Sequence, residues 1–216
     1  MINESRQFSL IDRIIIGFDN AVHTLLNNNS KSTRENPSNT IPESSLTTEE
    51  KFQAVCLMRV NHSGEVCAQA LYQGQALTAK SDEIRYKLEQ SGLEEYDHLA
   101  WCHSRITELG SHTSYLNPLW YAGSFTLGII AGLAGDKWNL GFIAATEYQV
   151  VEHLNNHLQR LPQSDLKSQA ILQQMRDDEN QHAETAISAG AAVLPLPVQM
   201  AMRVTSKLMT YSSYWV

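Results

Sequence analysis

The sequence predicts an all-α protein, and three observations support this. Apolar residues recur at spacings of three and four along most of the chain, which is the period of an amphipathic helix. No stretch offers the sustained alternation of apolar and polar residues that marks a half-buried strand. A pattern of one Glu, followed about 30 residues later by Glu-x-x-His, occurs twice, as two pairs of antiparallel helices would carry it.

The first element is a short amphipathic helix within residues 8–26. Its apolar face consists of Phe8, Ile11, Ile15, Phe18, Val22 and Leu25. Asp12, Arg13 and Asp19 interrupt the segment too often for a signal peptide. Residues 27–46 are rich in Asn, Ser and Pro and predict a flexible linker. The chain therefore divides into an N-terminal helix at 1–26, the linker at 27–46 and a main domain at 47–216.

Four long helices are expected in the main domain. Thr47 and Glu50 match a capping box ahead of a helix that runs to about residue 79. The second helix covers residues 82–109, and Gly110 stops it. The other two cover about 138–160 and 166–190, separated by Pro162 and Ser164. A further amphipathic segment, 195–214, ends in the aromatic residues Tyr211, Tyr214 and Trp215.

Residues 119–135 carry no charge and form an extra helix between the two pairs. Gly128 and Gly132 have the Gly-x-x-x-Gly spacing that lets two helices approach closely. At 17 residues the segment is slightly short for a bilayer span. Two interpretations stay open, a buried core helix and a helix that contacts lipid.

The repeated pattern supplies a set of metal ligands. One copy reads "EEYDHLAW" and contains Glu95 and His98, and the other reads "RDDENQHAET" and contains Glu179 and His182. Residues three apart share a helix face. The preceding helix of each half adds one Glu, so that the full set is Glu65, Glu95, His98, Glu147, Glu179 and His182.

Four carboxylates and two imidazoles are the ligand set of ferritin-like di-iron and di-manganese bundles. Two bridging carboxylates would hold the ions close together, and one His with one terminal carboxylate on each ion would leave positions open for oxygen. Without cations such a buried cluster must take up protons. The sequence thus predicts a ferritin-like four-helix bundle with a di-iron centre and extra apolar or amphipathic helices.

Neighbouring polar residues are weaker candidates for this site. Glu94 and Glu184 fall outside the repeated register, whereas Glu152 stays an alternative ligand. Cys67 and Cys102 read as small core residues, although whether they touch the metals is left open. Residues that would orient the ligand histidines are Asp97, Asp178 and His153.

Charge and cysteine content bear on the partners and the cellular compartment of the protein. A formal net charge of -7 without any basic run argues against a nucleic-acid partner. The three cysteines, Cys56, Cys67 and Cys102, have no CxxC spacing, which favours a reducing, cytoplasmic setting.

With these residues in view, the chain resembles the demethoxyubiquinone hydroxylase family. The resemblance covers roughly residues 50–216 and rests on "RVNHSGEVCAQALYQGQ", "EEYDHLAW", "ATEYQVVEHLNNHL" and "RDDENQHAE". It implies an O₂-dependent monooxygenase that holds two Fe ions per chain on the same six residues. The implied substrate is demethoxyubiquinol, 2-polyprenyl-3-methyl-6-methoxy-1,4-benzoquinol, in ubiquinone biosynthesis.

The resemblance also implies a peripheral protein on the cytoplasmic side of the cell membrane, because a polyprenyl tail is held in the bilayer by roughly 0.8 kcal/mol per CH₂. Residues 119–135 and 195–214, helped by the N-terminal helix, are the expected contacts with lipid. The chain has no GxGxxG fingerprint or Cys cluster, so the two electrons are expected from another protein, a diffusible donor or the quinol. Self-association or assembly into a ubiquinone-biosynthesis complex stays open. Two rival functions are a ferritin-like protein for iron storage or peroxide scavenging, and a non-enzymatic helical membrane-interaction protein.

Overall fold

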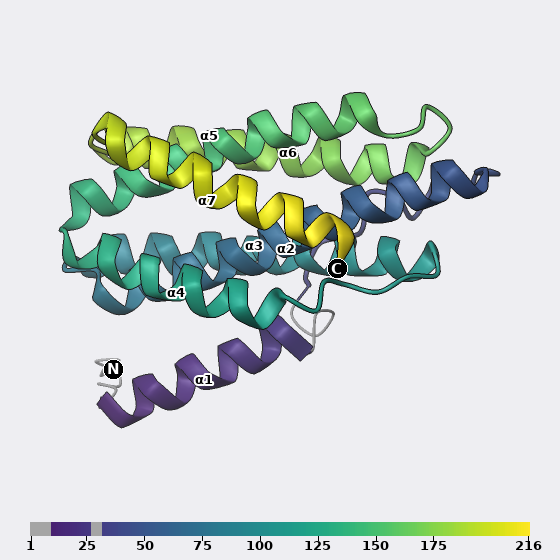
Figure 1. Ribbon diagram of the computed structural model, residues 1–216. Helices are drawn as coiled ribbons and strands as arrows, with labels where there is room; N and C mark the ends of the chain where they lie inside the picture. Colours follow the sequence, from purple (N-terminus) through teal and green to yellow (C-terminus); the bar gives the residue numbers. More distant parts are fainter. Residues whose placement is uncertain (1–9, 27–31) are drawn as a thin grey trace.

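The computed structural model describes residues 10–26 and 32–216 of the chain, and these residues form helices and connecting segments without a strand (Figure 1). The all-α prediction is confirmed. The described helices are α1 (Leu10–Leu26), α2 (Thr48–Thr78), α3 (Asp82–Glu108), α4 (Asn117–Leu133), α5 (Asp136–Arg160), α6 (Leu166–Ser188) and α7 (Leu196–Trp215).

Helices α2, α3, α5 and α6 make up the four-helix bundle, with α2 packed on α3 and α5 packed on α6. The two pairs meet through α3 with α6 and α2 with α5. A buried cluster that includes Leu57, Trp101, Leu154 and Met175 draws on all four helices and fills one end of the bundle. Burying these side chains supplies most of the driving force for packing. The four helices thus enclose one common interior, which agrees with the predicted ferritin-like bundle.

The predicted ends of α2 and α3 are confirmed by their local geometry. Thr47 Oγ1 accepts from the Glu50 backbone N–H, and Glu50 Oε2 accepts from the Thr47 N–H. The capping box thus satisfies two donors that the first turn leaves free. After α3, Gly110 takes a φ of 69°, a conformation that glycine adopts without a steric penalty.

Helix α4 packs on α2 through glycines of both helices. A Cβ on Gly128 would collide with the backbone at Leu71, and one on Gly74 would collide with the backbone of α4 at Phe125. The close approach predicted from the Gly-x-x-x-Gly spacing is therefore confirmed. Of the two interpretations left open for this segment, a buried core helix does not fit, because Leu119, Ile130 and Leu133 are exposed. None of the helices in the described ranges is long and apolar enough to cross a bilayer.

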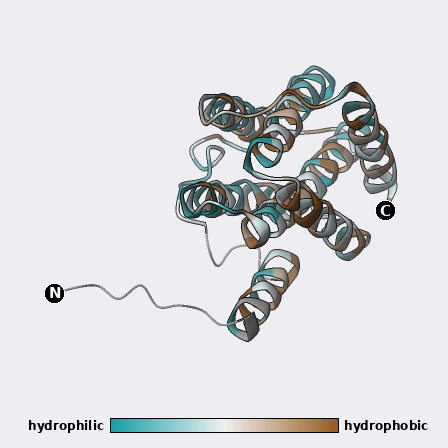
Figure 2. Cartoon of the chain, turned by 90° about the vertical axis from the view of Figure 1, so that its left-hand side faces the viewer, coloured by the Kyte–Doolittle hydropathy of each residue, from teal (hydrophilic) through white to brown (hydrophobic). Residues whose placement is uncertain are grey.

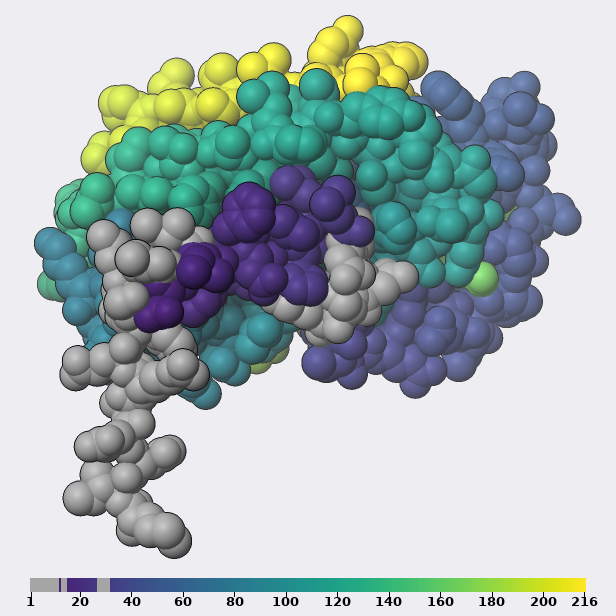
Figure 3. Space-filling view, turned by 90° about the horizontal axis from the view of Figure 1, so that it is seen from below, coloured from purple at the N-terminus to yellow at the C-terminus, as the bar shows by residue number. Residues whose placement is uncertain are grey.

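Helix α1 lies across the surface of the bundle beside α4 (Figure 3) and at the edge of the molecule in the end-on view of Figure 2. Thr24 is buried, and Ala21 and Leu25 pack against the bundle. Of the expected apolar face, Ile15, Phe18 and Val22 are exposed, with Phe18 at 72 %. Phe8 and the side chain of Ile11 lie outside the described residues. Most of the described apolar stripe of α1 thus faces away from the core.

The described part of the expected linker, residues 32–46, contains no helix and lies against the bundle. Thr33 and Arg34 donate backbone N–H groups to Asp97 on α3. Further along, Glu43 pairs with the buried guanidinium of Arg105 at 2.7 Å. These contacts hold both ends of this part of the segment, while the division of the chain at residues 26 and 47 stays a prediction.

Candidate metal centre

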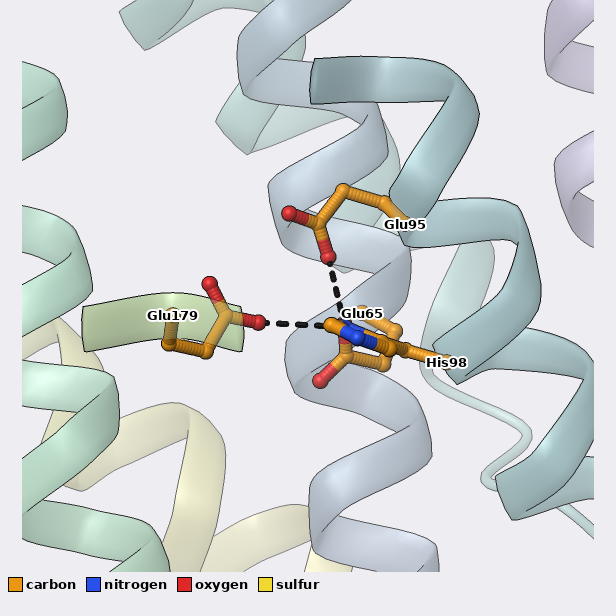
Figure 4. Close-up of side chains that lie close together, drawn as sticks. All are labelled: Glu65, Glu95, His98 and Glu179. Atoms are coloured by element: carbon orange, nitrogen blue, oxygen red, sulfur yellow. Dashed lines mark hydrogen bonds and ion pairs between the residues drawn. The ribbon is translucent and has the colours of Figure 1, made fainter. Parts of the chain in front are cut away.

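The six predicted ligands lie together in the interior of the bundle. Glu65 comes from α2, Glu95 and His98 from α3, Glu147 from α5, and Glu179 and His182 from α6; all six side chains are buried. Ligand atoms of Glu65, Glu95, His98 and Glu179 lie within 4.8 Å of one another, a group that could hold a metal ion. Figure 4 shows these four side chains converging from three helices.

Two of the carboxylates face both histidines. One oxygen of Glu95, Oε2, lies 3.2 Å from Nδ1 of His98, and the other, Oε1, lies 3.2 Å from Nδ1 of His182. Glu179 does the same, with Oε1 at 3.2 Å from His98 and Oε2 at 3.3 Å from His182. A carboxylate that presents one oxygen to each of two imidazoles is placed to bridge two cations.

The remaining two carboxylates lie at opposite ends of the cluster. Glu65 Oε2 lies 3.6 Å from Nδ1 of His98. Glu147 interacts electrostatically with His182, and its Oε1 accepts a hydrogen bond from the Tyr72 hydroxyl at 2.6 Å. One further carboxylate therefore interacts with each histidine.

The donor set fits divalent cations. Oε2 of Glu65 and Oε2 of Glu147 are buried and accept no hydrogen bond from the described residues. A buried carboxylate oxygen without a partner is costly, and a cation is the partner that would compensate it. Oxygen and imidazole nitrogen ligands suit iron, and manganese accepts the oxygen ligands.

The pKa shifts of the clustered residues in the metal-free protein also agree with a cation site. Burial raises the pKa of Glu65 and of Glu147 well above the usual range, and their neighbouring carboxylates add to the effect. Burial alone would lower the pKa of His98, but hydrogen bonds to Asp178, Glu179 and other carboxylates raise it well above the usual range. These groups therefore hold protons more tightly than usual when metal is not bound.

An outer carboxylate holds each histidine. Nε2 of His98 donates to Oδ2 of Asp178 at 2.9 Å, and Nε2 of His182 donates to Oε2 of Glu94 at 2.8 Å. With Nε2 engaged in this way, Nδ1 of each ring is directed at the carboxylate cluster. Each acid sits one residue before the ligand Glu of the opposite helix.

Only one of the three residues expected to orient the ligands does so. Asp178 contacts His98, but Asp97 accepts instead from the backbone of residues 33 and 34. His153 lies against the ring of His157, with the ring centroids 3.8 Å apart. Glu94 was missed, although the acid-Glu-x-x-His pattern in "EEYDH" and "DENQH" contains the signal.

The alternative ligands do not join the cluster. Glu152 and Glu184 are exposed on α5 and α6. Cys102 is buried, with its Sγ 3.7 Å from Met175 Sδ, which suits a core residue. Cys67 lines a cavity, and burial raises the pKa of its thiol to about 11, so it is held as the neutral thiol.

That cavity, of about 380 Å³, lies between α2, α4, α5 and α7 and has Glu65 in its wall. Most of its lining is apolar, with Leu71 from α2, Trp120 and Leu127 from α4, and Met202 from α7. An apolar site of this kind with few polar groups suits a small hydrophobic ligand. The cavity therefore has Glu65 of the candidate metal centre in its wall together with side chains of α4 and α7.

Comparison with known proteins supports one family. The family model described as ubiquinone biosynthesis protein COQ7 matches residues 53–213. Three similar relatives each carry the name 3-demethoxyubiquinol 3-hydroxylase. The protein from Nitrosomonas europaea is 56 % identical over 206 residues, covering 95 % of this chain and 99 % of the relative. Those from Nitrosococcus oceani and Ectopseudomonas mendocina are 51 % identical over 213 residues and 53 % identical over 209 residues, covering 99 % and 97 % of this chain and 100 % and 97 % of the relatives.

Proposed function

Because the chain belongs to the family of ubiquinone biosynthesis protein COQ7, we propose that it is a 3-demethoxyubiquinol 3-hydroxylase that uses two iron ions and O₂. The main structural support for metal binding is the placement of Glu95 and Glu179. Each of these carboxylates has one oxygen close to His98 and the other close to His182. The relatives' shared name supplies the reaction.

Six side chains would hold the metal. They are Glu65, Glu95, His98, Glu147, Glu179 and His182. Glu95 and Glu179 face both histidines, while Glu65 lies beside His98 and Glu147 interacts with His182. When bound, iron would supply the activation of O₂ and the oxygen transfer to the quinol ring, with two electrons from an external reductant. The chain's own part is to keep Nδ1 of each histidine directed at the cluster through Asp178 and Glu94, and to fix Glu147 through Tyr72.

The cavity is the proposed substrate site. Its apolar walls would exclude water and hold the quinol ring beside Glu65, while the polyprenyl tail leaves between α4 and α7. The tail gains about 0.8 kcal/mol for each CH₂ kept out of water, so the exit must open to lipid.

Exposed apolar side chains support a peripheral contact with the cytoplasmic side of the cell membrane. They lie on α1, α4 and α7 and include Phe18, Ile130, Leu133, Val204 and Leu208. Such side chains insert into the boundary between headgroups and acyl chains.

The rival functions are less well supported. A non-enzymatic helical protein with Glu and His as surface charges disagrees with the burial of all six residues. Iron storage or peroxide scavenging disagrees with the name shared by the relatives.

The test is to load the purified protein with Fe(II) without oxygen and then supply O₂, a reductant and demethoxyubiquinol in vesicles. Two irons per chain and the hydroxylated quinol are expected. Iron uptake and O₂ consumption without a hydroxylated product would refute the hydroxylase. The same assay on protein loaded with manganese tests whether hydroxylation requires iron.

A further inference from the structure

Arg34 lies outside the proposed ligand set, in the irregular segment that leads into α2. The backbone N–H groups of Thr33 and Arg34 donate to Oδ1 of Asp97 at 2.7 and 3.2 Å. Asp97 is buried on α3 and directly precedes His98. These two bonds fix the backbone of the segment beside one histidine of the candidate metal centre.

The side chain of Arg34 contacts both groups that flank His98. Its Nη1 donates to Oδ2 of Asp178 at 2.8 Å, and the same oxygen accepts from Nε2 of His98 at 2.9 Å. The guanidinium also lies over the ring of Trp101, 5.0 Å from its centroid. The Trp101 ring is 5.4 Å from that of His98. Arg34 thus completes a hydrogen-bonded chain from the segment to the histidine.

The opposite histidine is held differently. Asp178 has a side chain only 13 % exposed, and its Oδ1 accepts in addition from Gln174 at 2.9 Å. Glu94, which holds His182, has a side chain 52 % exposed. Among the described residues, the hydrogen bond that Glu94 accepts comes from His182, and Arg34 interacts with Glu94 electrostatically but not through a hydrogen bond. A carboxylate held by three donors keeps its position, whereas an exposed Glu retains more rotamer freedom.

We propose that Arg34 is a positioning residue of the metal centre, which fixes Asp178 and through it the ring of His98, so that the two metal positions differ in affinity. The inference rests on the metal-binding role proposed above. Removing Arg34 leaves the ligands in place but frees Asp178 to move. The metal position at His98 is then weakened, while the position at His182 is not.

The guanidinium charge by itself acts in the opposite direction, because a cation near the site repels the metal ions. The two effects are separable by substitution. Arg34→Met removes both the donor and the charge, whereas Arg34→Lys keeps the charge and one donor. If charge alone mattered, Arg34→Met would bind metal more tightly than the wild type.

The experiment is a titration of the full-length, metal-free protein with Co(II), followed by visible absorption, which reports binding without any turnover. Loss of an outer hydrogen-bond partner typically costs about 10–100-fold in metal affinity. We expect Arg34→Met to weaken one of two positions by about tenfold and Arg34→Lys to recover most of the loss. The matched control is Arg176→Met on α6, which removes an arginine paired with the exposed Asp177 and should leave both affinities unchanged.

A double substitution locates the effect. Asp178→Asn should weaken the same position, and adding Arg34→Met to it should cause no further loss if Arg34 acts through Asp178. Equal weakening of both positions, tighter binding in Arg34→Met, or an undiminished effect in the Asp178→Asn background would overturn the proposal. Two unchanged positions in Arg34→Met would overturn it as well, and would leave the proposed metal centre intact. A wild-type protein that binds no Co(II) and no Fe(II) would refute both.

Discussion

Asp178 on α6 accepts a hydrogen bond from His98 on α3, with 2.9 Å between Oδ2 and Nε2. The relationship is reciprocal, since Glu94 on α3 accepts from His182 on α6 at 2.8 Å. Each of these two helices therefore carries its own Glu-x-x-His and also the acid that orients the histidine of the other. When α3 packs against α6, both histidines therefore gain their carboxylate partners together.

Removing a bridging carboxylate should abolish metal-dependent activity. We expect Glu179→Ala to lose hydroxylation and to bind fewer than two irons per chain, because Glu179 faces both histidines. Circular dichroism should still show the helical fold. Glu184→Ala, an exposed Glu on the same helix, is the control and should bind two irons. Activity near the wild-type level in Glu179→Ala would refute the ligand assignment.

Replacing the acids that accept hydrogen bonds from the two histidines should lower metal binding or activity less than replacing a proposed ligand does. Asp178→Asn and Glu94→Gln are each expected to lower iron affinity or turnover by about 10–100-fold, because the histidine loses a charged acceptor. Asp177→Asn changes an exposed acid next to Asp178 and should leave both quantities unchanged. Equal behaviour of Asp177→Asn and Asp178→Asn would contradict the role given to the 2.9 Å contact.

Metal affinity should rise with pH. In the metal-free protein, burial raises the pKa of Glu65 and Glu147, and carboxylate partners raise the pKa of His98 above its usual range despite burial. Raised pKa values mean that these groups hold their protons to higher pH than usual, and that the stability they contribute without metal is lost as pH rises. Metal must displace those protons, so binding should release them and strengthen from about pH 6 to pH 8. Calorimetry in two buffers of different ionisation enthalpy measures the release, and an affinity that falls with pH would contradict it.

The contact between α4 and α2 should not tolerate a larger residue. Gly128→Ala places a methyl group against the backbone at Leu71, and we expect a loss of about 1–3 kcal/mol or more in the free energy of unfolding. Gly123→Ala is the matched control, because a Cβ there meets no atom within 4 Å. Its better helix propensity should leave stability unchanged or raise it by up to about 1 kcal/mol. Urea denaturation of both variants measures the difference.

Membrane binding should depend on the outer face of α4. Ile130→Asp is expected to weaken binding to lipid vesicles by about tenfold or more, since a buried Ile contributes roughly 1.5–3 kcal/mol. Tyr86→Asp removes an exposed apolar residue from α3 and serves as the control. Flotation with vesicles measures both variants. Equal loss in the two would point to a general effect of negative charge and not to a lipid-contacting face.

Much of the site was readable from local patterns. The period of an α-helix places residues three apart on one face, so Glu95 with His98 and Glu179 with His182 followed from spacing alone. The same holds for the capping box at Thr47 and Glu50, whose two hydrogen bonds join residues three apart. Interactions of this range depend little on the rest of the fold.

Other features were decided only when the helices packed. Spacing did not show which carboxylates face both histidines, because that depends on how α3 and α6 are rotated toward each other across the bundle. The Asn- and Ser-rich composition of residues 27–46 predicted a flexible linker, yet Arg34 in this segment donates a hydrogen bond to Asp178 on α6. Backbone N–H donors such as those of this segment leave no pattern in the sequence. The sequence by itself determined the helices and the two Glu-x-x-His pairs, since both rest on local periodicity. The tertiary structure decided which ligand faces which, since contacts between distant segments depend on the packing of the whole bundle.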